Sequence, residues 1–240
     1  MTIMSEHTAK AFDVDLQDLG RLVAEMGGLA EKEIGDARDA LSKHDIALAQ
    51  RAIATDVRID ALQREIEEKS ILTIARRQPM AVDLREIVGA LRVSNDLERI
   101  GDLAKNIAKR VGAIDGDVQL QKIMRGVEHM SDLVLAQIKD VLDSFARRDA
   151  VKALAVWRGD EEIDAVNNSL FRELLTYMME DPRNISWCIH LLFCAKNIER
   201  MGDHATNIAE TVYYMVEGHA LADERPKGDT TASATVAYPS

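Results

Sequence analysis

The feature that most constrains the fold of this chain is a repeated segment. Residues 97–108 (LERIGDLAKNIA) and 198–209 (IERMGDHATNIA) lie 101 residues apart and share Glu, Arg, Gly, Asp and Asn in register. In a helix, residues four positions apart lie on one face. Each copy therefore carries a stripe of side-chain oxygens, and the two stripes consist of Glu98, Asp102 and Asn106 and of Glu199, Asp203 and Asn207.

The hydrophobic pattern around this repeat is helical throughout. Aromatic residues make up only 4% of the chain and there are four prolines, which favours helix over sheet. Amphipathic periodicity and turn signals at Pro79 and Pro182 predict six long helices, at residues 13–42, 45–77, 82–111, 118–146, 149–180 and 184–217. Short connections make neighbouring helices antiparallel, so we expect an all-α fold of two tandem, pseudo-symmetric antiparallel three-helix bundles.

The duplication also predicts the domain organisation. The end of the chain is small, polar and proline-containing, which is typical of disorder. The expected divisions are a flexible N-terminus (1–12), a first three-helix repeat (13–115), a second three-helix repeat (116–219) and a disordered tail (220–240).

Charge and cysteine usage exclude several classes of protein. The net charge of −11 repels nucleic acid and anionic lipid, so we expect no nucleic-acid partner and only indirect membrane contact. Cys188 and Cys194 lie six residues apart in an apolar helical run, which suits reduced core thiols. We see no signal peptide and no apolar run of the roughly 18 residues that a membrane span needs. These features indicate a cytoplasmic protein.

A second pair of carboxylates precedes each copy of the repeated segment: Asp56 with Asp60, and Asp160 with Asp164. The first pair is centred 22 residues before position 80, and the Glu98/Asp102 pair is centred 20 residues after it. At a rise of about 1.5 Å per residue, both pairs lie about 30 Å from the turn. The corresponding separations from position 181 in the second copy are 19 and 20 residues. Each hairpin should therefore bring two carboxylate pairs to one level.

Clustered carboxylates suggest a bound cation. Like charges four residues apart cost a helix about 0.2–0.5 kcal/mol per pair, and isolated pairs are usually solvated surface, but the duplication and the matched levels favour a site. Hard oxygen donors suit Mg²⁺, Mn²⁺, Ca²⁺ or iron, whereas His204 alone is a poor basis for zinc. Because the apolar stripe of the helix lies opposite Glu98 and Asp102, we expect the metal ion to lie at the surface of the bundle. The candidate ligands are Asp56, Asp60, Glu98, Asp102, Asp160, Asp164, Glu199 and Asp203, with Asn106 and Asn207 as secondary candidates.

Gly101 and Gly202 interrupt good helix formers in both copies. Each costs about 1 kcal/mol relative to alanine in a helix interior, so we expect a close approach there. A helix crossing and access for a metal ion would each explain it.

Two three-helix repeats, each with an Asp-x-x-x-Asp pair followed by Glu-Arg-x-Gly-Asp-x-Ala-x-Asn-Ile, resemble the PhoU family over residues 13–219. The resemblance implies a non-enzymatic cytoplasmic regulator, usually a homodimer, that represses the phosphate-starvation response. In that family, the regulator links the ATPase subunit of the phosphate ABC transporter to a membrane sensor histidine kinase. The resemblance also implies that the eight carboxylates bind metal.

Two of the differences between the copies near these carboxylates concern polar or charged side chains that would affect a bound metal ion. Leu103 stands where the second copy has His204, and Arg64 where the second has Asn168. We therefore expect the two sites to differ in metal occupancy.

Two other readings compete with a metal-binding regulator. The first is a di-iron carboxylate enzyme, but no Glu in this chain has a His three residues later, as such bundles require. The second is a structural scaffold whose acidic stripes only maintain solubility.

Overall fold

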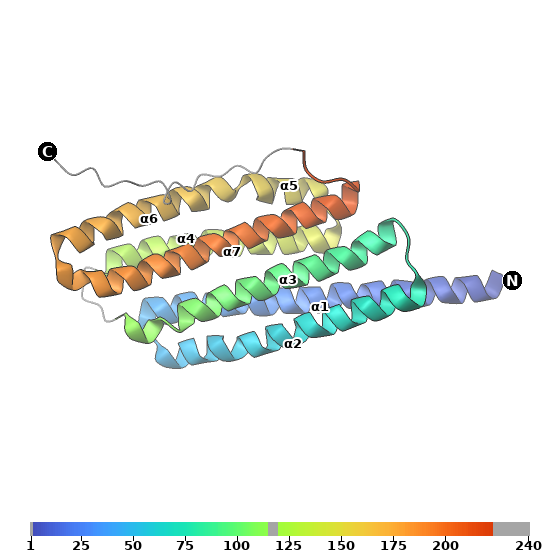
Figure 1. Ribbon diagram of the computed structural model, residues 1–240, viewed down its shortest axis with the longest axis horizontal. Helices are drawn as coiled ribbons and strands as arrows, with labels where there is room; N and C mark the ends of the chain where they lie inside the picture. Colours follow the sequence, from blue (N-terminus) through green and yellow to red (C-terminus); the bar gives the residue numbers. More distant parts are fainter. Residues whose placement is uncertain (1, 115–119, 223–240) are drawn as a thin grey trace.

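The computed structural model describes the backbone of residues 2–114 and 120–222, and the side chains of residues 12–114, 123–159 and 161–222. These residues are helical, without strands (Figure 1). The α-helices are α1 (Thr2–Lys43), α2 (Ile46–Arg77), α3 (Val82–Ala108), α4 (Leu120–Arg147), α5 (Ala150–Arg158), α6 (Asp160–Glu180) and α7 (Ile185–Glu217). Short 3₁₀ helices follow α3 at Val111–Ala113 and α6 at Pro182–Asn184.

The helices form two antiparallel bundles that lie side by side. Helices α1 to α3 pack as the first bundle and α4 to α7 as the second, while α3 packs along α7 and α1 along α4. The α2–α3 and α6–α7 connections lie at opposite ends of the molecule (Figure 1). The predicted all-α fold of two three-helix repeats is therefore confirmed, with one helix of the second repeat divided into α5 and α6.

Equivalent sequence signals begin the second helix of each repeat. Asp45 and Asp149 lie 104 residues apart, and their carboxylates accept 2.9 Å hydrogen bonds from the backbone N–H groups of Leu48 and Lys152. Such a bond satisfies one of the donors that a helix N-terminus leaves without an intrahelical partner. The pseudo-symmetry thus extends to the turns between helices.

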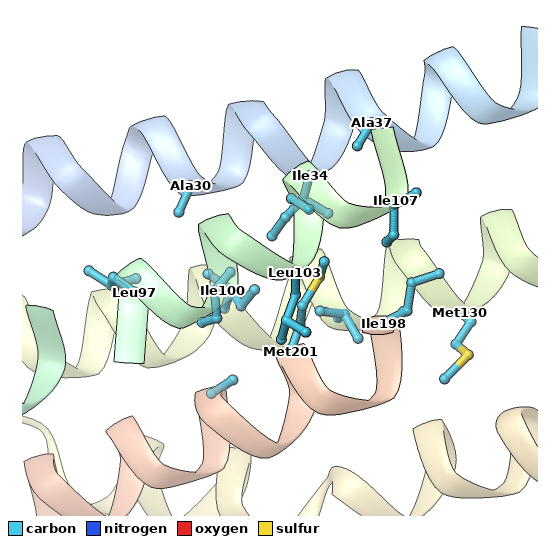
Figure 2. Close-up of a cluster of buried hydrophobic side chains, with 14 of the residues drawn as sticks. Ala30, Ile34, Ala37, Leu97, Ile100, Leu103, Ile107, Met130, Ile198 and Met201 are labelled. Atoms are coloured by element: carbon cyan, nitrogen blue, oxygen red, sulfur yellow. The ribbon is translucent and has the colours of Figure 1, made fainter. Parts of the chain in front are cut away.

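One apolar core runs through both bundles. Figure 2 shows side chains from α1, α3, α4 and α7 converging between the helices. The labelled members are Ala30, Ile34, Ala37, Leu97, Ile100, Leu103, Ile107, Met130, Ile198 and Met201. The two repeats therefore do not bury separate cores.

Two helix bounds differ from the sequence expectations, and one predicted segment is not described by the structure. Helix α1 begins at Thr2 instead of Asp13, because neither proline nor glycine interrupts the intervening residues. The single helix predicted for 149–180 is wrong: it breaks at Gly159, whose N–H is shared between the carbonyls of Ala155 and Val156. Residues 223–240 of the predicted tail lie outside the described residues.

Both cysteines are free and buried, as predicted. In the part of the chain that the structure describes, none of the helices has the length and apolar character needed to cross a membrane.

Candidate functional site

The first carboxylate cluster lies between α2 and α3 and is joined by a lysine. Lys105 on α3 places its Nζ 2.6 Å from Asp56 on α2 and 2.5 Å from Asp102 on its own helix. The ammonium group therefore bridges the two helices at the level predicted from the hairpin. The hairpin geometry predicts that these carboxylates meet, but Lys105, which joins them, is not among the predicted site residues.

The other two predicted carboxylates of this cluster, Asp60 and Glu98, lie around its rim. Burial raises the pKa of Glu98, and the neighbouring charges of Asp102, Asp60 and Asp56 add to that rise against the opposing effect of Arg99. The Arg99 guanidinium lies 3.3 Å from Glu98 and 3.6 Å from Asp102. Repulsion among the four carboxylates is thus partly relieved by one arginine and one lysine.

A fifth carboxyl group, Glu33 on α1, lies beneath this cluster. Glu33 is fully buried, and neither of its carboxyl oxygens has a hydrogen-bond partner among the described residues. Glu33 is not among the residues predicted for the site. Its signal was an acidic residue within the apolar stripe of α1, in phase with Met26, Ala30 and Ala37.

The burial of Glu33 controls its ionisation. Burial raises the pKa of Glu33 from 4.5 to about 9, and the negative charge of Asp56 adds to the rise. Burial alone would lower the pKa of Lys105, but its hydrogen bonds to Asp102 and Asp56 outweigh that effect and hold the pKa above its ordinary value. Near neutral pH, Glu33 is therefore a neutral acid while Lys105 remains charged.

Gly101 allows this carboxyl to approach the backbone of α3. A Cβ atom at Gly101 would lie 3.1 Å from Cδ1 of Ile59 and 3.4 Å from Oε2 of Glu33. The first contact is closer than ordinary van der Waals packing. Of the two explanations for this glycine, a helix crossing and access for a metal ion, the packing of α3 against α1 and α2 thus supports the helix crossing.

The expectation of a surface site is wrong for three of the carboxylates. Asp56 is only 3% exposed, and Asp164 and Glu199 are each 5% exposed. Asp56 lies in the buried stripe of α2 with Ala52 and Ile59, so it faces the other helices of its bundle. The pattern of α3 alone places the acidic face opposite the apolar stripe and does not show the packing of α1 and α2.

The predicted second set of carboxylates lies on α6 and α7 of the second bundle. Lys196, one turn before Glu199 on α7, donates a 2.8 Å hydrogen bond to Glu199. Asp203 is half-buried, and the side chain of Asp160 lies outside the described residues. A hollow of about 250 Å³ lies between α4, α5 and α6 and is lined in part by Gln137 and Gly159, but by none of the described carboxylates of this set.

His204 and Asn207, which follow Asp203 on α7, contact α3 of the first bundle. His204 faces α3, where its Nδ1 lies 2.9 Å from Asp96, and Asn207 donates a 3.4 Å hydrogen bond to the same carboxylate. Leu103, at the position equivalent to His204, is buried in the shared core. Asn106 is exposed. These contacts place His204 and Asn207 at the α3–α7 interface.

The donor chemistry of the first cluster fits a hard cation. Its donors are carboxylate oxygens, which hard cations prefer. Both carboxyl oxygens of Glu33 and the Oδ1 atom of Asp56 are buried and have no hydrogen-bond partner among the described residues. Within those residues, however, no three His, Cys, Asp or Glu side chains are arranged around a position that could hold a metal ion. In this conformation the ammonium of Lys105 supplies the positive charge.

Comparison with known proteins gives full-length matches. The PhoU domain model matches residues 23–111 and 127–212. A "Phosphate-specific transport system accessory protein PhoU homolog" from Rhizobium meliloti (strain 1021) is 58% identical over 227 residues, covering 95% of this chain and 96% of the relative. A protein of the same name from Caulobacter vibrioides (strain NA1000 / CB15N) is 50% identical over 226 residues, covering 94% and 98%.

Solved structures match the fold as well. The crystal structure of PhoU from Pseudomonas aeruginosa superposes with a TM-score of 0.80 at 40% identity, covering 87% of this chain and 100% of that one. The phosphate transport system regulatory protein PhoU from Streptococcus pneumoniae also gives a TM-score of 0.80, at 28% identity, covering 88% and 99%. With two matched domains, two bundles and near-complete coverage of its relatives, this chain belongs to the PhoU family.

Proposed function

We propose that this chain is a non-enzymatic accessory protein of phosphate-specific transport that represses phosphate-starvation signalling. The observation that carries the proposal is the 58% identity over nearly the whole length of a relative named as an accessory protein of that transport system. The proposed partners are a second copy of the chain, the ATPase subunit of the phosphate transporter and a sensor histidine kinase, with the protein acting in the cytoplasm.

Deletion of the gene in its host tests the regulatory role. A phosphatase reporter of phosphate starvation should rise in phosphate-rich medium, because the repressing link between transporter and kinase is lost. Expression of the intact chain from a plasmid should restore repression. A reporter that stays repressed in the deletion strain would count against negative regulation.

We also propose divalent metal binding as part of this role. The candidate ligands in the first cluster are Asp56, Asp60, Glu98 and Asp102. A bound metal would supply positive charge to the clustered carboxylates. The support is the donor chemistry described above and the duplication of the acidic pairs, whose second set is Asp160, Asp164, Glu199 and Asp203.

Alanine at Asp102 and Asp203 tests the metal sites. The double variant should lose most of the Mg, Mn, Ca or Fe that mass spectrometry detects in the purified wild-type protein, because one ligand is removed from each cluster. Glu67→Ala, at an exposed acidic position of α2, serves as the control and should retain the wild-type metal content. If the double variant holds as much metal as the control, the carboxylate sites are not the binding sites.

A further inference from the structure

Lys105 occupies the centre of the first cluster. Its ammonium lies within 2.6 Å of carboxylates on two different helices, Asp56 and Asp102. An ammonium group has three N–H donors, of which two are used in these bonds. Its position between the helices is the position from which a small cation would contact both carboxylates.

Glu33 independently indicates a cation-binding position. It is fully buried, both of its oxygens lack hydrogen-bond partners among the described residues, and Lys105, Asp56 and Asp102 act on it electrostatically. A buried carboxyl without a hydrogen bond is costly unless a cation or a proton satisfies it; in the metal-free protein a proton does so, and a metal ion would take its place. The cluster thus offers oxygen donors from α1, α2 and α3.

The second repeat lacks both of these residues. The residue equivalent to Lys105 is Thr206, whose hydroxyl donates a 3.0 Å hydrogen bond to the Gly202 carbonyl. The residue equivalent to Glu33, 104 positions later, is Gln137. Neither residue therefore has an equivalent in the second repeat, where Lys196, three residues before Glu199, donates to that carboxylate instead.

We propose that Lys105 is a tethered cation that competes with divalent metal for the first cluster, with Glu33 as a third-helix ligand when metal replaces it. This inference deepens the proposed metal binding and rests on it. The first cluster consequently binds divalent metal more weakly than its carboxylates alone would, because the ammonium must be displaced.

Mn²⁺ titration of the full chain, followed by electron paramagnetic resonance of free Mn²⁺, tests this competition. All variants carry Asp203→Asn to weaken the second cluster. Lys105→Thr, which introduces the side chain of the second repeat, should increase Mn²⁺ affinity about tenfold or more. Adding Glu33→Gln to Lys105→Thr should reverse most of that gain.

Lys109→Thr is the matched control, because Lys109 is exposed and lies one turn further along the chain from Lys105. It should leave Mn²⁺ affinity unchanged. Equal affinity with and without Lys105 would overturn the inference, as would an equal gain from Lys109→Thr. Neither result would affect the regulatory role, which the reporter experiment tests separately.

Folding of the Lys105→Thr variant gives a second test. Without the ammonium, the clustered carboxylates should lower the melting temperature in chelator, and Mn²⁺ should restore it by a larger increment than in the Lys105 protein. If the variant is unfolded in chelator, Mn²⁺ should restore its helical circular dichroism. A variant that remains unfolded in Mn²⁺, or that gains no more from Mn²⁺ than the Lys105 protein does, would overturn the proposal.

Discussion

Glutamine in place of Glu33 should stabilise the metal-free protein by about 1–3 kcal/mol near pH 7 and abolish one component of its pH dependence. The folded protein raises the pKa of Glu33 from 4.5 to about 9, so folding takes up a proton in the window between these values. The stability that the neutral carboxyl contributes is fully present below about pH 4.5 and is lost as the pH rises towards 9. Glutamine has a similar shape and does not titrate.

Urea unfolding in chelator, at about pH 5, 6.5 and 8, measures this effect. The difference in unfolding free energy between the Glu33→Gln variant and wild type should grow with pH and nearly vanish at the lowest value. Glu25→Gln, on the exposed face of the same helix, should show no such trend. A constant difference at all three pH values would mean that Glu33 is not protonated on folding. Gln137 at the equivalent position of the second repeat indicates that the amide is sterically acceptable.

Alanine in place of Ile100 should lower the free energy of unfolding by about 2–5 kcal/mol and destabilise both repeats together. Ile100 has no exposed surface, and it lies where α1, α3 and α7 converge (Figure 2). The lost methyl groups leave a cavity in a core that the bundles share, so the second bundle loses packing partners along with the first. Unfolding should remain a single transition.

The two tryptophans make this prediction specific, because Trp157 and Trp187 both lie in the second repeat while Ile100 lies in the first. The midpoints of urea unfolding, followed by tryptophan fluorescence and by far-ultraviolet circular dichroism, should both move to lower urea concentration by the same amount. The control, Ile71→Ala, removes a side chain that is 57% exposed and should change stability by less than about 0.5 kcal/mol. Tryptophan fluorescence that unfolds at the wild-type urea concentration would show that the repeats are energetically independent.

The helices were predictable because their signals are local. Caps such as Asp45 and Asp149, the turns at Pro79 and Pro182 and the apolar periodicity act within a few residues. Apart from the start of α1 and the break at Gly159, the resulting helix bounds agree with the structure to within a few positions. The break at Gly159 was missed because a single glycine in an amphipathic pattern is compatible with either a continuous or an interrupted helix.

The meeting of Asp56 with Asp102 was also within reach of the sequence. Both lie on adjacent helices of one hairpin, so the rise per residue and the position of the turn determine their relative height. The burial of Asp56 was not predictable in this way, because it depends on where α1 packs across the hairpin.

The sequence by itself determined the duplication, the all-α class and the meeting of carboxylates within the first hairpin, since each follows from periodicity along one or two consecutive helices. Only the tertiary structure decided that Glu33 from α1 lies under the first cluster, that Lys105 joins it, and that the two bundles share one core. These three features arise from the docking of helices far apart in the chain. That docking depends on the complementary shapes of whole helix faces, which no local pattern of residues specifies.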